Sequence, residues 1–205
     1  MYVILFNVTE NLIKVSDEKL YSVLKETQHV LNAYSLARVY VSYSAILDSL
    51  HKEWREKILR SPMYEDALFL EELSYRARLY VVTNLDKMLV KQILVRNNLD
   101  VFIQDVISAD DVKRYKPSKE FFEYVGKRVN SPLPSIMLVS SNPYDILVAK
   151  SLNMKAHWLN RKGEAFMFPS NLQPDSVIKT VKSIAESTAQ HKVDSSMGDS
   201  ALRCT

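Results

Sequence analysis

Glycine is scarce in this chain: Gly126, Gly163 and Gly198 are the only three among 205 residues. An average protein contains about 7% glycine. Phosphate-binding loops need several glycines close together, because the backbone must approach the phosphate groups. The scarcity therefore excludes the dinucleotide-binding fingerprint and the P-loop.

Cysteine and long apolar runs are also rare. The single cysteine, Cys204, excludes an intrachain disulfide, which is compatible with a reducing compartment. We find no apolar run of about 18 residues, the length that a membrane-spanning helix needs. The first residues lack the basic start of a signal peptide. We therefore expect a cytoplasmic protein that does not enter a membrane.

Charge of one sign is not concentrated anywhere. Lys and Arg number 27 and Asp and Glu 24, which leaves a net charge of +3 without a long basic run. This argues against nucleic acid as the main partner. Hydrophobic residues make up 47% and charged residues 25%, as in globular proteins. The length suits one domain, or a core with a small inserted cap.

Short apolar segments alternate with helical patterns in most of the chain. The segments are rich in β-branched and aromatic residues, which is typical of buried strands. The sequence predicts strands at 2–6, 79–82, 101–103, 135–139, 155–159 and 177–178. It predicts helices at 86–95, 118–129, 143–152 and between 178 and about 185, and a polar loop that leads to Lys116-Pro117.

A long stretch between the first two strands has only helical spacing. Ser16-Asp17-Glu18 is typical of a helix start, because a capping side chain precedes an acid near the positive end of the helix dipole. Apolar residues then recur at helical spacing until Ser61-Pro62 breaks the pattern. We interpret residues 15–76 as an inserted helical cap.

Alternating strands and helices predict an α/β fold, a Rossmann-like parallel sheet core with an inserted helical cap. The core comprises residues 1–14 and 77–185, and residues 186–205 are expected to be a disordered tail. Ligands of such sheets lie beyond the carboxyl ends of the strands. The residues that matter most therefore directly follow the strands: Asn7, Thr83, Asn84, Ser140, Ser141 and Asn142.

The segment from Ser140 to Asp145 is the densest polar cluster at a strand end. Asn142 is a good helix cap, Pro143 suits the first helical position, and Asp145 falls in the first turn. This alone is an ordinary helix start. The same geometry also aims donors at the ligand side of the sheet, and such helix starts bind anions. The two interpretations are compatible.

Several motifs, taken in order, resemble the haloacid dehalogenase superfamily, and its L-2-haloacid dehalogenase branch in particular. They are the strand ending at Asn7, the strand ending at Thr83-Asn84, and the segments 114–118, 138–145, 148–150 and 160–163. The resemblance covers about residues 1–14 and 77–182. It is strongest between Asp105 and Gly163.

The resemblance implies a mechanism and a set of roles. In that family an aspartate displaces a halide, and water then hydrolyses the aspartyl ester. Here Asn7 holds the nucleophile position, with Val8 and Thr9 beside the substrate. The implied roles of the other residues are as follows: Thr83, Asn84 and Tyr144 bind substrate, Lys116 pairs with the nucleophile position or the substrate, Ser140 and Asn142 hold the catalytic groups, and Asp145 positions the water.

The sequence departs from the family at its first motif. The family has Asp, two residues, Gly and Thr, whereas this chain has Asn7-Val8-Thr9-Glu10-Asn11. An amide has no charge and little nucleophilicity, so covalent catalysis is expected to be impaired. Phosphatases of the superfamily bind magnesium through acids. Asp145 alone does not supply such a site, and we predict no metal and no cofactor.

The family's cap also supplies an arginine that accepts the leaving halide. Here Tyr34 or a neighbour falls at that place, and Arg38, the nearest arginine, is expected on another helical face. Phe122 stands where the dehalogenases have a tyrosine. The cap tyrosines Tyr34, Tyr40 and Tyr43 are expected to be packing residues.

Three functions remain open. The first is a degenerate hydrolase that retains a cleft for a small carboxylate or phosphate-like anion. The second is an active hydrolase in which Asp145 or Glu10 activates water directly. The third is a protein-interaction module that uses the cap helices. A homodimer is expected by resemblance only.

Overall fold

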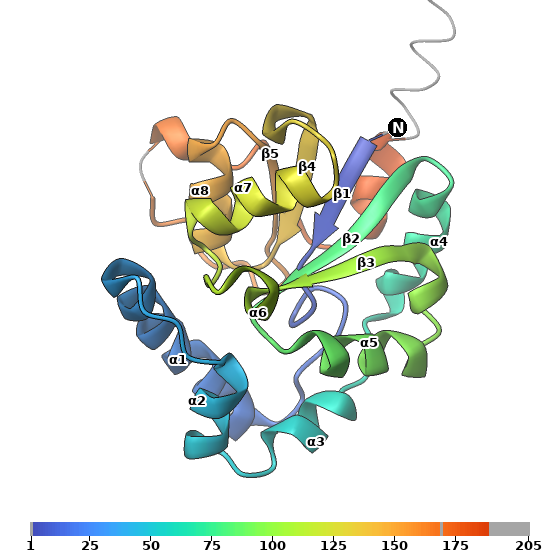
Figure 1. Ribbon diagram of the computed structural model, residues 1–205. Coiled ribbons are helices and arrows are strands. Elements are labelled where there is room, and N and C mark those ends of the chain that lie inside the picture. The colour runs from blue at the N-terminus through green and yellow to red at the C-terminus, as the bar shows by residue number, and fades with distance from the viewer. Residues whose placement is uncertain (1, 169, 189–205) are drawn as a thin grey trace, which may run out of the picture.

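The computed structural model describes residues 2–168 and 170–188, and a six-stranded sheet lies at its centre (Figure 1). All neighbouring strands are parallel, in the order β3-β2-β1-β4-β5-β6. The strands are β1 (Tyr2–Phe6), β2 (Ala77–Thr83), β3 (Ile103–Ser108), β4 (Ile136–Ser140), β5 (Lys155–Leu159) and β6 (Ser176–Ile178). This confirms the Rossmann-like α/β fold. β1 lies in the middle of the sheet, so Asn7 emerges at its centre.

Helices cover both faces of the sheet. Side chains alternate along a strand. Accordingly, Ile4 and Phe6 belong to one buried cluster and Val3 and Leu5 to another. The first cluster includes residues of α4 (Phe69–Ser74) and α5 (Lys87–Arg96). The second includes residues of α7 (Lys119–Arg128) and α8 (Pro143–Ser151). Four short 3-10 helices, η1 (Glu65–Leu68), η2 (Asp100–Phe102), η3 (Leu133–Ser135) and η4 (Ser170–Leu172), complete the connections.

The stretch between β1 and β2 is helical, as expected. Asp17 caps α1 (Glu18–Ala37) by accepting a hydrogen bond from the Leu20 N–H. α2 (Tyr43–Leu50) and α3 (Trp54–Leu59) follow. Leu47 and Trp54 are fully buried in the first cluster, so these helices share the core of the sheet. α1 to α3 are called the helical insert below, whereas α4 packs against β2.

The helical insert is attached to the core near α5 and α6 (Ala109–Val112). The Tyr40 hydroxyl donates to Asp110 at 2.5 Å, and the Tyr115 hydroxyl bonds to the backbone of Val41. Burial and Asp110 raise the pKa of Tyr40, so this phenol stays protonated and remains a donor. Asp86 accepts hydrogen bonds from Ser44 and Arg55 of the insert. These contacts fix the insert beside the carboxyl ends of the strands.

Three sequence predictions differ from the structure. Val101 and Phe102 lie in the 3-10 helix η2, and strand β3 begins only at Ile103. The predicted polar loop before Lys116 contains α6, which a capping box between Ser108 and Asp111 stabilises. Residues 186–188 belong to a helix that begins at residue 182, so they are not part of a disordered tail. The rest of the predicted tail, 189–205, lies outside the described residues.

Candidate functional site

The loop after β1, where the sequence departs from the expected motif, contains one residue in the left-handed conformation. Glu10 has a φ of 60°, in the left-handed region. Glycine adopts this conformation without strain, whereas a residue with a Cβ atom does so at a cost of about 1–2 kcal/mol. The Glu10 carboxylate accepts hydrogen bonds from the Val15 N–H and the Tyr64 hydroxyl. Burial and the Glu10 carboxylate raise the pKa of Tyr64 to about 12, so its hydroxyl remains a donor.

Asn11 connects this loop to β4. Its side chain is fully buried, its Nδ2 donates to the Val139 carbonyl at 2.8 Å, and its Oδ1 accepts from the Ser141 N–H at 2.8 Å. The Arg161 guanidinium donates to the Asn11 carbonyl at 2.8 Å and forms an ion pair with Asp66. It also lies over the Tyr64 ring, 3.8 Å from the centroid. These contacts connect the loop that follows Asn7 to the end of β4 and to Arg161.

The end of β4 forms the helix start that the sequence predicts. Asn142 caps α8 by accepting from the Tyr144 N–H at 3.1 Å, and Pro143 is the first helical residue. The Ser140 hydroxyl accepts from the Asn142 N–H at 3.1 Å. The backbone donors of Ser141, Asn142 and Tyr144 are therefore matched by side chains of the protein itself.

Lys116 and Asp145 form an ion pair beneath this helix start. Lys116 Nζ lies 2.8 Å from Asp145 Oδ2, and their side chains are 3% and 0% exposed. Ser140 Oγ donates to the same carboxylate oxygen at 2.9 Å. Asp145 Oδ1 is buried and has no hydrogen-bond partner among the described residues. The structure thus brings Lys116, Ser140 and Asp145 together, in a buried position.

Thr83 and Asn84 are occupied by contacts within the chain. The Thr83 hydroxyl is buried and accepts from the Leu85 N–H at 3.0 Å. Asn84 Oδ1 accepts from the Lys116 N–H at 2.8 Å, and Asn84 Nδ2 donates to the Lys116 carbonyl at 3.1 Å. These two bonds fix the backbone of Lys116. Substrate binding by Thr83 and Asn84 stays a prediction.

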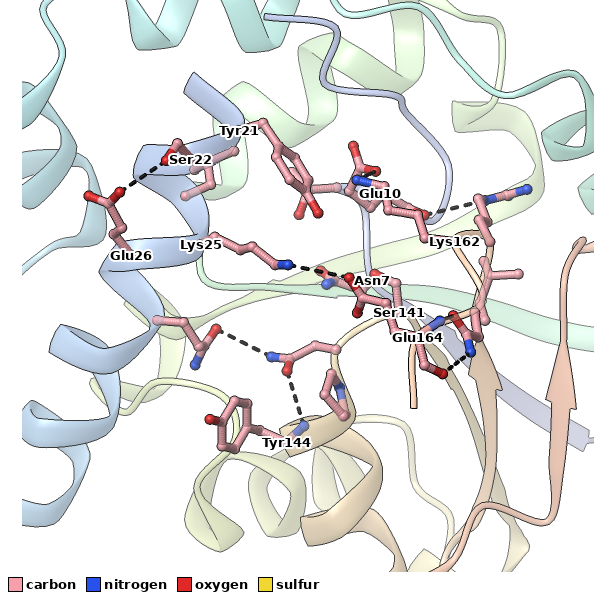
Figure 2. Close-up of a pocket in the computed structure, with 18 of the residues that line it drawn as sticks. Asn7, Glu10, Tyr21, Ser22, Lys25, Glu26, Ser141, Tyr144, Lys162 and Glu164 are labelled. Carbon is pink, nitrogen blue, oxygen red and sulfur yellow. Dashed lines mark hydrogen bonds and ion pairs between the residues drawn. The ribbon is translucent and has the colours of Figure 1, made fainter. Parts of the chain in front are cut away.

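A cleft of about 670 Å³ lies between α1 and the loops after β1, β4 and β5 (Figure 2). Four residues of the predicted site line it: Asn7, Thr9, Asn142 and Tyr144. The other six do not: Val8, Thr83, Asn84, Lys116, Ser140 and Asp145. The predicted site is thus divided between a cleft and a buried polar cluster behind it.

Three contacts cross the cleft between α1 and the core. Lys25 Nζ lies 3.3 Å from the Glu164 carboxylate (Figure 2). Gln28 accepts from Asn142 Nδ2 at 3.3 Å. Lys162 Nζ lies over the Tyr21 ring, 3.6 Å from its centroid. The hydrogen bond to Glu164, with a further contribution from Tyr21, raises the pKa of Lys25, so Lys25 remains an ammonium.

The helical insert places no arginine in the cleft. Arg38 follows the last residue of α1 and does not line it. Tyr34 packs against Tyr115, with ring centroids 6.3 Å apart, and Tyr40 packs against the same ring at 5.0 Å. The Tyr43 hydroxyl bonds to Thr27. The three tyrosines are therefore packing residues, as the sequence predicts.

The carboxylates near β1 and β4 do not fit a magnesium site. Magnesium prefers several hard oxygen ligands, usually with one or two carboxylates. Asp145 Oδ2 is already paired with Lys116, and Asn7, Ser140 and Ser141 are neutral. Within residues 2–168 and 170–188, no three His, Cys, Asp or Glu side chains come together as metal ligands. The absence of a metal stays a prediction.

Sequence reasoning missed two residues that shape the site. In the sequence, Asn11 is noticeable only as a replacement of the family's threonine, and nothing assigns a role to Arg161. Arg161 stands in the Asn160–Gly163 stretch that is part of the resemblance, and a cation two residues after a strand end is a signal that points to this edge of the sheet. Nothing in the sequence indicates that Asn11 is buried.

Comparison with known sequences gives a consistent group of relatives. A family model described as haloacid dehalogenase-like hydrolase matches residues 6–159. The (S)-2-haloacid dehalogenase of Pseudomonas putida is 27% identical over 86 residues, which are 42% of this chain and 38% of that protein. The (S)-2-haloacid dehalogenase of Pseudomonas sp. (strain YL) is 24% identical over 127 residues, 62% of this chain and 54% of that protein. The chain thus spans about two fifths to one half of these curated relatives.

Solved structures share the fold. The L-2-haloacid dehalogenase from Xanthobacter autotrophicus with chloropropionic acid covalently bound superposes with a TM-score of 0.77 at 15% identity, over 91% of this chain and 97% of that one. The HAD phosphatase from Thermococcus onnurineus gives a TM-score of 0.63 at 21% identity, over the same shares. None of the helices within residues 2–168 and 170–188 has the length and the apolar character that a membrane crossing requires.

Proposed function

The chain belongs to the haloacid dehalogenase-like hydrolases, and on that premise we propose that it is a hydrolase by ancestry, of the 2-haloacid dehalogenase type, that has lost covalent aspartyl catalysis. It retains a cleft that binds a small organic anion. Residues 15–76 act as the cap of this cleft, and residues 1–14 and 77–185 form its core.

The proposal rests on one observation, the presence of an asparagine at residue 7. Asn7 follows the central strand and lines the cleft, at the position where the family has its nucleophile. Its Oδ1 accepts the Val8 N–H at 2.9 Å. A carboxylate at this position attacks the substrate carbon, forms an ester and releases halide. An amide oxygen that already accepts a hydrogen bond is a poor nucleophile. Removal of a covalent nucleophile typically costs several orders of magnitude in rate.

The alternative of direct hydrolysis requires Asp145 or Glu10 to activate water. A general base must lie within hydrogen-bond reach of the water that it deprotonates. Asp145 is fully buried, and Lys116 and Ser140 both bond to its Oδ2. Glu10 does line the cleft, but donors already contact both of its carboxylate oxygens. The geometry therefore favours the loss of catalysis over a new mechanism.

An interaction module through the insert has less support. Leu36 and Leu50 are 87% and 52% exposed. Single exposed apolar residues are common on protein surfaces and do not by themselves indicate a partner. The homodimer, the cytoplasmic location and the absence of nucleic-acid binding stay predictions.

The experiment is a turnover assay of the unmodified protein. Chloride release from L-2-chloropropionate and phosphate release from a phosphate monoester are measured with and without magnesium, and Asp145→Asn serves as the control variant. We expect no release above the uncatalysed rate from either compound. Release that grows with protein concentration and disappears in Asp145→Asn would show that the cleft is catalytic without an aspartate at residue 7.

A further inference from the structure

The amide of Asn7 presents a free donor to the cleft. Only Oδ1 can accept the Val8 N–H, and this bond of 2.9 Å fixes which way the amide is turned. Asn7 Nδ2 has no hydrogen-bond partner in the part of the chain that the structure describes. Its NH₂ group is therefore available to a ligand, and Asn7 is more than an inert replacement of a nucleophile.

Two hydroxyl groups in the same cleft also lack a hydrogen-bond partner among the described residues. Thr9 and Ser141 both line it, and Ser141 is drawn beside Asn7 in Figure 2. Neither hydroxyl bonds to another residue within 2–168 and 170–188. Asn7, Thr9 and Ser141 are called the polar floor below. The polar floor thus offers three neutral donors, whereas the backbone donors of Val8 and Ser141 are already matched.

The charges around the polar floor are balanced. Glu164 contacts Lys25, and Glu10 lies 3.7 Å from Lys162. Glu26 accepts from Ser22. Three cations and three acids line the cleft, listed as Lys25, Arg161, Lys162, Glu10, Glu26 and Glu164. Because these charges cancel, an aspartate at residue 7 would make the cleft net negative and repel an anionic ligand, whereas the neutral Asn7 adds no repelling charge.

The wall of the cleft is apolar and partly aromatic. Leu24, Tyr144 and Leu159 line it. Tyr144 is supported by Phe168, with ring centroids 5.4 Å apart, and the contacts continue through Phe166 to Trp158. A volume of about 670 Å³ falls in the range of roughly 300–1,000 Å³ that drug-sized ligands occupy. A three-carbon haloacid fills only a small part of such a space.

We propose that the cleft binds an organic carboxylate with an aromatic or similarly bulky apolar body, and that Asn7 Nδ2, Thr9 Oγ1 and Ser141 Oγ hold its carboxylate. The apolar body packs against Tyr144 and Leu24. This inference rests on the proposed function, because it requires a cleft that binds anions without consuming them. In this proposal Asn7 donates a hydrogen bond to the ligand, which an ionised aspartate cannot do.

The test is a binding titration with 3-phenylpropionate. Calorimetry compares the unmodified protein, Asn7→Asp and the matched control Asn130→Asp, which makes the same chemical change at an exposed residue outside the cleft. We expect Asn7→Asp to bind at least about tenfold more weakly, about 1.4 kcal/mol, and Asn130→Asp to bind like the unmodified protein. The unmodified protein should bind propionate, which lacks the ring, at least about tenfold more weakly than 3-phenylpropionate.

Two further measurements keep the test decisive. If Asn7→Asp does not fold, the double variant Thr9→Val/Ser141→Ala removes two donors without adding charge, and it should also lose affinity for 3-phenylpropionate. Asn7→Asp should weaken binding of the neutral 3-phenylpropionamide less than it weakens binding of 3-phenylpropionate, because the amide carries no charge to repel.

Several results would overturn the inference. Equal affinity of Asn7→Asp and the unmodified protein for 3-phenylpropionate would show that Asn7 does not hold the carboxylate of the ligand. Equal affinity for propionate and 3-phenylpropionate would show that an apolar body of the ligand does not contribute to binding. These results leave the proposed function intact. By contrast, chloride release by the unmodified protein would contradict the proposed function whatever the binding data show.

Discussion

Lys116 and Asp145 form a buried ion pair, with Nζ and Oδ2 2.8 Å apart and side chains that are 3% and 0% exposed. The resemblance implies that Lys116 pairs with the nucleophile position or the substrate, yet here its ammonium contacts the Asp145 carboxylate behind the cleft. A buried charge is tolerated when it is paired and hydrogen-bonded. This pair is therefore important for the integrity of the fold around the site.

Removing either partner should destabilise the protein strongly. We expect Lys116→Met or Asp145→Leu to lower the free energy of unfolding by about 3–5 kcal/mol, because each leaves an uncompensated buried charge. The double variant should cost clearly less than the sum of the two. Urea unfolding of the four proteins measures this coupling, and the exposed pair Glu56–Arg60 gives the control cycle, with coupling near zero. Additive effects at Lys116 and Asp145 would show that the two groups do not depend on each other.

Asn11 should be as important as a core residue. Asn11→Ala leaves the Ser141 N–H without its partner, and it leaves the Val139 carbonyl with only the longer hydrogen bond from the Asn7 N–H at 3.3 Å. We expect the free energy of unfolding to fall by about 2–3 kcal/mol. Asn97→Ala serves as the matched control, since the Asn97 side chain bonds to the Ile93 carbonyl of its own helix end and connects no two loops. If Asn11→Ala costs no more than Asn97→Ala, then Asn11 does not hold the two loops together.

His157 should make stability depend on pH. Burial lowers the pKa of His157 below its ordinary value of 6.5, and its Nδ1 lies 2.6 Å from Ser176 Oγ. Between the lowered pKa and 6.5, the unfolded chain binds more protons than the folded one. This contribution to stability is therefore complete above pH 6.5 and is lost as the pH falls from 6.5 to the lowered pKa.

Urea unfolding at several pH values between 5 and 8 measures this effect. The unmodified protein should lose stability toward pH 5, and His157→Gln should show a smaller loss over the same window, because glutamine does not titrate. An identical pH dependence of the two proteins would show that another group causes it.

Restoring the aspartate should not restore the enzyme. Asn7→Asp supplies a nucleophile but leaves Glu10 and Asn11 in the motif, and the helical insert still places no arginine in the cleft for the leaving halide. We expect chloride release from L-2-chloropropionate to stay at the uncatalysed rate in this variant. Robust release by Asn7→Asp alone would show that the other departures cost little.

The sequence predicts the sheet well and the site only in part. The alternation of strand and helix patterns and the capping residues Asp17 and Asn142 are local signals. The sequence therefore predicts the core and these helix starts directly. The sequence places the start of the strand at Ile103 too early, because the apolar Val101 and Phe102 are consistent with either a strand or a short helix.

The division of the site into a cleft and a buried cluster was not predictable from residue types. Whether Lys116 reaches a ligand depends on its distance from Asp145 in space, and spacing along the chain does not give that distance. Likewise, the free donor of Asn7 depends on how its amide is turned toward Val8. Such facts require side-chain positions.

The central claim is that residue 7 no longer forms a covalent intermediate. The most direct measurement is the intact mass of the unmodified protein after incubation with L-2-chloropropionate and an acid quench, followed by mapping of the peptide that contains Asn7. We predict an unchanged mass, with no chloride released. A propionate adduct on this peptide, formed as chloride leaves, would contradict the loss of covalent catalysis.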